Sequence, residues 1–146
     1  MSENECQFPE FNPEDEEVKG ILENNRIIAV VGLSTNPEKD SYRVAKYLQE
    51  HGYQIVPVNP KPEAILGQKC YPNLTAIPFP VDIVDVFRKI EAIPAIVDEA
   101  IAIGAKVVWM QLGLAENQSA RKAMAAGLKV VMNKCLKIEH SRYFPR

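Results

Sequence analysis

A run of small and polar residues follows a short apolar segment near the N-terminus, and its residue types suit a phosphate group. Residues 27–31 are all apolar, and Gly32, Ser34 and Thr35 come directly after them. Glycine at the end of a buried strand lets the chain turn sharply and lets a ligand approach the backbone. A helix with Ser41 as its expected N-cap directs free N–H groups and a positive dipole end toward this loop. The stretch therefore predicts an anion site for a phosphate or pyrophosphate.

This loop departs from the glycine-rich pattern of dinucleotide-binding sites. That pattern has glycine at three positions, whereas Ser34 and Pro37 stand where the second and third would fall. For this stretch taken alone, an ordinary turn between a strand and a helix is the alternative interpretation. Residues later in the chain favour the ligand site.

The end of the second expected strand, residues 54–58, distinguishes among phosphate-bearing ligands. Sites for NAD usually carry Asp or Glu here, which accepts hydrogen bonds from the ribose hydroxyls. Asn59, Pro60 and Lys61 stand here instead. A lysine suits a ribose that carries a phosphate, which favours CoA or NADP over NAD. A solvated lysine after a proline turn is the alternative.

Further cations and polar groups fall near the ends of other expected strands. Phe87 and Arg88 end the third strand, Gln111 ends the fourth, and Arg43 lies near the start of the helix after the phosphate loop. The Phe87 ring offers an aromatic face to an adenine. Each of these side chains has an ordinary interpretation as core or solvated surface. Because several fall on one edge of the same predicted sheet, we expect them to line a ligand groove.

Strand-like and helix-like segments alternate along the chain, and three helices end in glycine just before a new strand. This pattern predicts right-handed βαβ units. The expected fold is α/β, a Rossmann-like open parallel five-stranded sheet of order 3-2-1-4-5 with helices on both faces. The ligand crevice is expected outside the carboxyl ends of the strands, between strands 1 and 4. The five expected strands are residues 27–31, 54–58, 81–87, 106–111 and 129–132.

The composition is that of an ordinary globular protein. The 146 residues suffice for one domain, with 47% hydrophobic and 25% charged residues. The net charge of −2 argues against a nucleic-acid or anionic-membrane binder, and no apolar run approaches a membrane span. The acidic N-terminus lacks a signal-peptide pattern, so we expect a cytoplasmic protein. Residues 1–12 are expected to be a flexible lead-in to a single domain, residues 13–146.

Groups for metal or acid–base chemistry are few. Cys6, Cys70 and Cys135 are widely separated, and His51 and His140 have no ligand spacing. We expect structural thiols, surface histidines and no metal site. Because no acid–base pair can be spaced on this sequence, we expect no catalytic residue and no enzymatic activity of the chain by itself.

Five segments together resemble the small, stand-alone CoA-binding protein family: residues 31–34, 41–45, 57–61, 81–88 and 109–113. That family is similar to the N-terminal CoA-binding domain of the succinyl-CoA synthetase α subunit and of NDP-forming acyl-CoA synthetases. The resemblance covers roughly residues 14–140. It implies a Rossmann-like domain that holds CoA along the strand ends.

The resemblance also implies roles for single residues. It would place the pyrophosphate at residues 32–35 and the helix start at Ser41, and the adenosine phosphate near Lys61. Phe87, Arg88 and Gln111 would line the groove. The synthetases carry a second domain with a phosphorylated histidine, to which nothing here corresponds, so ligase activity is not implied.

We therefore expect a protein that binds CoA or an acyl-CoA as its small-molecule ligand and acts as a carrier, a sensor or a partner subunit. Two alternatives remain open from the sequence. One is an NADP-binding domain of the oxidoreductase type, and the other is an interaction module with a vestigial nucleotide pocket.

Overall fold

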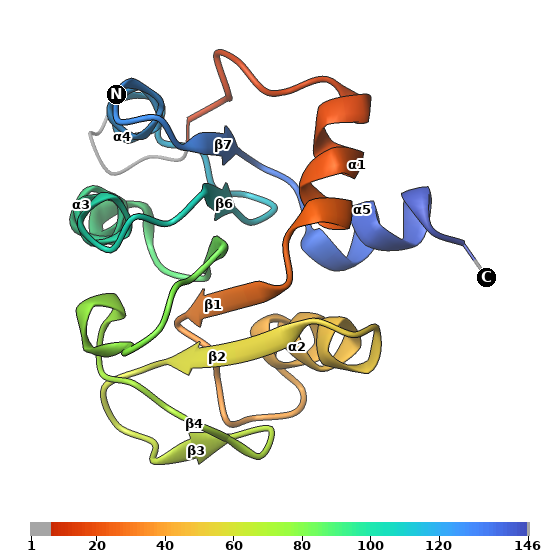
Figure 1. The fold of residues 1–146 in the computed structure, drawn as a ribbon, viewed down its shortest axis with the longest axis vertical. Helices are drawn as coiled ribbons and strands as arrows, with labels where there is room; N and C mark the ends of the chain where they lie inside the picture. The colour runs from red at the N-terminus through yellow and green to blue at the C-terminus, as the bar shows by residue number, and fades with distance from the viewer. Residues whose placement is uncertain (1–6, 146) are drawn as a thin grey trace.

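The computed structural model describes residues 7–145, and a five-stranded parallel sheet forms its centre (Figure 1). Apolar, largely β-branched residues fill the strands, as expected for a parallel sheet that is covered on both faces. The predicted class, an α/β Rossmann-like open sheet, is confirmed. The strands are β1 (Ile27–Val31), β2 (Gln54–Val58), β5 (Ile83–Val86), β6 (Val107–Met110) and β7 (Lys129–Val131).

The strand order is β2-β1-β5-β6-β7, which differs from the predicted order 3-2-1-4-5 in the place of one strand. β5, the third strand along the chain, pairs with β1, whereas the prediction put it outside β2. The outer edge of β2 is occupied instead by Tyr71, whose N–H donates to the Pro57 carbonyl and whose carbonyl accepts from the Asn59 N–H, both at 2.9 Å. The topological switch point therefore lies between β1 and β5, not between strands 1 and 4.

Helices cover both faces of this sheet (Figure 1). One face carries α3 and α4, and the other carries α1, α2 and α5. Within residues 7–145 none of the helices is long and apolar enough to cross a membrane. Their bounds are α1 (Asp15–Asn24), α2 (Asp40–Glu50), α3 (Ile93–Ala102), α4 (Asn117–Ala125) and α5 (Leu136–Tyr143).

Between β2 and β5 the chain forms short elements in place of a long helix. A two-stranded antiparallel hairpin comes first, and a single helical turn follows it. A second such turn leads into α3. These elements are β3 (Ala64–Ile65), β4 (Gln68–Lys69), η1 (Leu74–Ala76) and η2 (Ile90–Ala92).

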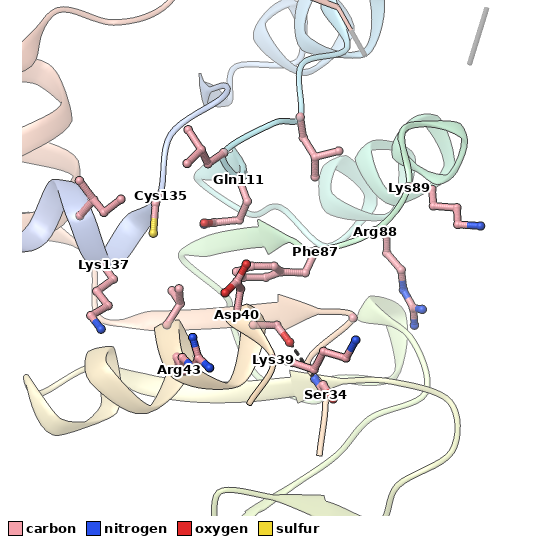
Figure 2. Close-up of a pocket in the computed structure, with 16 residues that line it drawn as sticks. Ser34, Lys39, Asp40, Arg43, Phe87, Arg88, Lys89, Gln111, Cys135 and Lys137 are labelled. Carbon is pink, nitrogen blue, oxygen red and sulfur yellow. Dashed lines mark hydrogen bonds between the residues drawn. The ribbon is translucent and has the colours of Figure 1, made fainter. Parts of the chain in front are cut away.

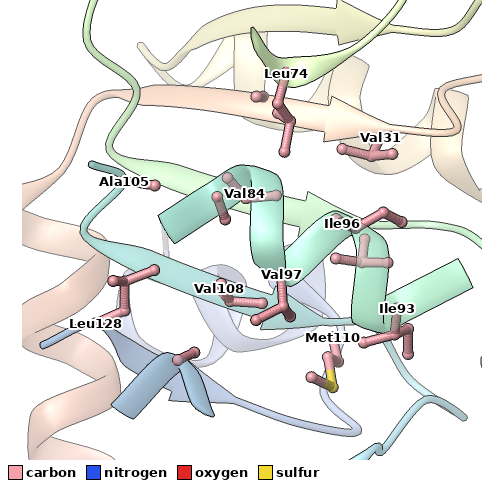
Figure 3. Close-up of a cluster of buried hydrophobic side chains, with 14 of the residues drawn as sticks. Val31, Leu74, Val84, Ile93, Ile96, Val97, Ala105, Val108, Met110 and Leu128 are labelled. Carbon is pink, nitrogen blue, oxygen red and sulfur yellow. The ribbon is translucent and has the colours of Figure 1, made fainter. Parts of the chain in front are cut away.

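The core under α3 fixes the two strands whose ends matter most for the site. Ile93 and Ile96 of α3 pack in one buried cluster with Val84 of β5 and Val108 of β6 (Figure 3). Burying each such side chain stabilises the fold by roughly 1.5–3 kcal/mol. Since successive side chains of a strand point to opposite faces, Asp85 lies on the other face of β5, toward the side of α2 and α5.

The C-terminal segment, for which the sequence pattern predicted no helix, forms helix α5. His140, expected at the surface, is buried, and its Nδ1 lies 2.9 Å from the Tyr47 hydroxyl. Burial lowers the pKa of His140, and the charges of His51 and Arg26 lower it further. The buried face of α5 includes the polar residues His140 and Glu139. Apolar periodicity therefore does not reveal this helix.

The predicted lead-in, residues 1–12, lies partly outside the described residues, which begin at Gln7. Asn117 of α4 contacts this segment: its Oδ1 accepts from the Glu10 N–H and its Nδ2 donates to the Phe8 carbonyl, both at 2.9 Å. Asn12 exchanges two hydrogen bonds with the backbone of Met132. Residues 7–12 thus lie against α4 and the end of β7.

Candidate functional site

A cavity of about 910 Å³ opens at the carboxyl ends of β1, β5 and β6, next to the first turn of α2 and the start of α5 (Figure 2). This volume is within the range of small-molecule sites. The residues that line it are Gly32, Ser34, Lys39, Asp40, Ser41, Arg43, Val44, Phe87, Arg88, Lys89, Gln111, Leu112, Leu114, Cys135, Lys137 and Ile138.

Gly32 forms the turn at the end of β1 and has a positive φ of 90°. A Cβ atom at this position would lie 2.1 Å from the carbonyl oxygen of Phe87. The two strand ends are held close because the Phe87 N–H donates to the Val31 carbonyl at 2.8 Å. The sequence interpretation assigned the glycine to the approach of a ligand. The structure adds that the close contact between β1 and β5 itself requires it.

The loop after β1 is tied to the first turn of α2. The Ser41 Oγ accepts a hydrogen bond from the Ser34 N–H at 3.0 Å, which is the dashed line in Figure 2. Ser41 was predicted as the N-cap, but Lys39 occupies that position and the helix begins at Asp40. In the described part of the chain no side chain caps this helix, so its first N–H groups are available to an anion at the loop.

The cavity wall carries positive charge although the chain has a net charge of −2. Of the described residues, Asp40 is the single acidic one in the wall. Within residues 7–145, no ion pair involves any of the basic residues that line the cavity. A concave site with uncompensated cations attracts an anion. The basic residues in the wall are Lys39, Arg43, Arg88, Lys89 and Lys137.

Asp85 and Gln111 form a buried polar pair at the cavity. The Gln111 Nε2 donates to the Asp85 Oδ1 at 2.5 Å, and the second oxygen of Asp85 is buried without a hydrogen-bond partner in the described part of the chain. Burial raises the pKa of Asp85 to about 8, although the hydrogen bond from Gln111 opposes this effect. The sequence places Asp85 in a strand but does not reveal its partner.

The structure brings most of the predicted site residues to the cavity, and four lie outside its wall. Asn59 is tied to the loop next to the wall, because its Nδ2 donates to the Leu33 carbonyl at 3.0 Å. Thr35 and Pro60 are exposed, and so is Lys61, whose N–H donates to the Asn59 Oδ1 at 3.3 Å. Those in the wall are Gly32, Ser34, Ser41, Arg43, Phe87, Arg88 and Gln111.

The residues that sequence reasoning missed fall in two groups. Lys39, Asp40, Val44 and Lys89 lie beside predicted site residues, and the others come from the loop after β6 and from α5 with the residue before it. Leu112 and Ile138 are large apolar side chains that are 64% and 53% exposed beside the cavity. Leu114 and Cys135 also line this part of the wall. The position of Cys135 after the last strand was the available signal for that residue, and the unpredicted helix α5 hid Lys137 and Ile138.

Cysteine contributes one thiol to the described wall of the cavity, that of Cys135, and the described residues offer no metal site. Cys6 lies outside the described residues, and Cys70 and Cys135 are unbridged. Burial raises the pKa of the Cys70 thiol. In the part of the chain that the structure describes, no group of three or more His, Cys, Asp or Glu side chains is arranged to hold a metal ion.

Comparisons with known proteins agree at the levels of sequence and structure. Residues 26–141 match the protein family described as CoA binding domain. The Bacillus subtilis protein YneT is 40% identical over 130 residues, which cover 89% of this chain and 96% of that protein. The solved structure of a hypothetical protein from Pyrococcus horikoshii is 43% identical, with a TM-score of 0.88, and the match covers 98% of this chain and 99% of that one.

A longer enzyme contains a similar segment. The ADP-forming acetate–CoA ligase I of Archaeoglobus fulgidus is 28% identical over 121 residues. The match covers 76% of this chain but 18% of the ligase. The chain is thus related to one part of an ADP-forming synthetase.

Proposed function

The chain belongs to the CoA-binding domain family, and from this premise we propose that it binds coenzyme A or an acyl-CoA as a carrier, a sensor or a partner subunit. The observation that carries the proposal is the cluster of cations around a cavity at the Gly32 loop, which have no ion-pair partners within residues 7–145. CoA combines a pyrophosphate and a 3′-phosphate with a long, mostly uncharged arm. Phosphate groups suit both the cations and the N-terminus of α2.

The order of the strands suggests a direction for the ligand. From β2 to β7, the strand ends carry Lys61, Gly32, Phe87, Gln111 and Cys135 in turn. Neighbouring strands lie about 4.8 Å apart, so the four steps span about 19 Å. We infer that the 3′-phosphate lies near Lys61 and the pyrophosphate at the Gly32 loop. The pantetheine arm then passes Phe87 and Gln111 and directs its thiol toward Cys135.

The two sides of the cavity support this direction. In Figure 2, Arg88 and Lys89 lie on one side and Cys135 on the other. The exposed apolar side chains of Leu112 and Ile138 also line the wall. They suit the arm or an acyl group better than a charged nucleotide. Lys137, on the Cys135 side, has its ammonium group 5.6 Å from the centre of the Tyr47 ring.

A ligand panel tests the proposal. Calorimetric titration and thermal unfolding would compare CoA, acetyl-CoA, dephospho-CoA, NADP and NAD. We expect CoA to bind and to add about 2.7 kcal/mol of stability when present at about 100 times its Kd. Tight binding of NADP without binding of CoA would instead support an NADP-binding domain. No stabilisation by any nucleotide would favour an interaction module.

Variants of the wall locate the binding. Arg43→Ala and Arg88→Ala should each weaken CoA binding about tenfold, because each removes one charge-assisted contact. Lys129→Ala is the matched control, since Lys129 is an exposed cation at the opposite end of the sheet. Equal effects of all three changes would indicate a general charge effect and count against binding at this cavity.

A further inference from the structure

The buried pair of Asp85 and Gln111 fixes the direction of one amide group. Asp85 is fully buried, and its neighbours in the sheet register are Val30 of β1 and Trp109 of β6. With its Nε2 donating to Asp85, the Gln111 amide has its nitrogen toward the strand and its oxygen toward the opposite side. Gln111 is 4% exposed, yet it lines the cavity, and Figure 2 shows the oxygen at the tip of its side chain there.

We propose that Asp85 is a positioning residue, which holds the Gln111 amide so that its carbonyl oxygen accepts a hydrogen bond from an N–H of the ligand. This inference rests on the proposed function, under which the donor is an amide N–H of the pantetheine arm. Gln111 follows β6, two strands away from the Gly32 loop where the phosphates are expected. The arm carries one hydroxyl near the pyrophosphate and two amide groups farther along. Under this placement the amide groups are the polar groups of the ligand closest to β6.

Packing alone does not explain an acid at this position. A fully buried carboxyl with one hydrogen-bond partner costs stability, and its register neighbours are apolar. The ionised carboxyl can only accept this N–H. In the protonated form Oδ1 still accepts it when the proton is on Oδ2, the oxygen that has no partner among the described residues. Without that acceptor, the Gln111 amide is free to turn over and to present its NH₂ group to the ligand. Asp85 therefore lowers the stability of the fold but fixes the Gln111 carbonyl oxygen as an acceptor in the cavity.

The first test removes the acceptor itself. Gln111→Met keeps the length of the side chain and lacks the amide. Titrations would use CoA and the arm-free fragment 3′-phospho-ADP. We expect CoA to bind about tenfold more weakly and the fragment to bind as it does to the wild type. Gln118→Met, at an exposed position of α4, is the matched control and should change neither affinity.

The second test separates positioning from stability. Asp85→Leu should weaken CoA binding as much as Gln111→Met does, leave fragment binding unchanged and not lower the urea midpoint of unfolding. Asp85→Asn should keep the CoA affinity within about twofold, because its Oδ1 accepts the same N–H. The double variant Asp85→Leu/Gln111→Met should bind CoA no more weakly than either single variant, since both remove the same contact.

Several results would overturn this inference. They are an equal loss for CoA and the fragment in Gln111→Met, no loss in that variant, or wild-type CoA affinity in Asp85→Leu. If the leucine variant does not fold, NMR decides, because slow solvent exchange of the Gln111 side-chain amide protons is expected in wild type and in Asp85→Asn. Fast exchange in wild type would overturn the role of Asp85. Wild-type protein that binds neither ligand would instead overturn the proposed function, and with it the ligand named here.

Discussion

The two edges of the parallel sheet differ in how their polar groups are satisfied. At the amino edge, one Asp82 oxygen accepts from the N–H groups of Arg26 and Ile27 at 2.9 and 3.0 Å, and the other lies 3.4 Å from the Lys106 ammonium. Toward the carboxyl edge, Asp85 has one partner and the cavity cations have no ion pair among the described residues. The charged groups at the amino edge find their partners within the chain, whereas the carboxyl edge has charged groups that remain available to a ligand.

The pKa values of Asp82 and Asp85 are shifted in opposite directions, in line with this difference between the two edges. Burial alone would raise the pKa of Asp82, but the N–H groups of Ile27 and Arg26 and the charge of Lys106 outweigh it and lower the pKa. Burial dominates at Asp85, only three positions later, and raises the pKa to about 8. The same residue type thus serves to hold the fold together at one edge and weakens the fold at the other.

Asp85→Asn should produce the largest change in stability. The pKa of Asp85 rises from an ordinary value of 3.8 to about 8 on folding, so between these values the unfolded chain loses a proton that the folded chain keeps. The free energy of unfolding of the wild type should therefore fall as pH rises through this window, by up to about 1.4 kcal/mol per pH unit, and level off above it. The variant should lack this component. Urea unfolding from about pH 5 to pH 9 measures the difference, and parallel curves would contradict it.

Gly32→Ala should have the next largest effect, with Gly104→Ala as its counterpart at the amino edge. Both glycines have a positive φ, but a Cβ at Gly32 meets the Phe87 carbonyl, whereas no atom of residues 7–145 lies within 4 Å of one at Gly104. We expect a loss of about 1–2 kcal/mol at Gly104 from the left-handed conformation and at least about 1 kcal/mol more at Gly32. Thermal or urea unfolding gives both values. Equal losses of stability would mean that the end of β5 can move away from a Cβ at position 32 at little energetic cost.

Asp82→Asn should lower stability by about 2 kcal/mol near neutral pH, because it removes the charge that two N–H groups contact. The lowered pKa of Asp82 means that its contribution is present above the ordinary value and is lost as pH falls through the folded value. The difference from wild type should therefore shrink in strong acid, in the opposite direction to the effect at Asp85. A difference that stays constant as pH falls far below the ordinary pKa of 3.8 would count against the charged contact.

Lys61→Ala should show the smallest effect, and only on binding. Lys61 is exposed after β2, so we expect about 1.5 kcal/mol, roughly tenfold, weaker binding of CoA if its ammonium contacts the 3′-phosphate. Dephospho-CoA, which lacks that phosphate, should bind the variant and the wild type alike. Higher salt should narrow the preference of the wild type for CoA. Lys129→Ala, at the amino edge, serves as the control in the same titrations, and equal losses for both ligands would exclude a specific contact.

Local sequence determined strands β1 and β2 and the turn at Gly32, from which the site is built. The apolar runs of β1 and β2 have the predicted bounds, 27–31 and 54–58, because a strand buried on both faces needs only a continuous apolar segment between turn residues. Gly32 was evident for the same reason, since it ends such a segment. Because parallel strands end at one edge of the sheet, Arg43, Phe87 and Gln111 were predicted to lie together. All three line the cavity.

Tertiary structure decided what depends on residues far apart in the chain. Periodicity does not specify whether the third strand pairs with β1 or with the outer edge of β2. In the structure β5 pairs with β1, and Tyr71 occupies the outer edge of β2. Nor does periodicity reveal that Asp85 meets Gln111, 26 positions later, or that α5 buries His140. Strand and helix patterns report which faces are apolar, whereas these features depend on hydrogen bonds and burial between segments that only folding brings together.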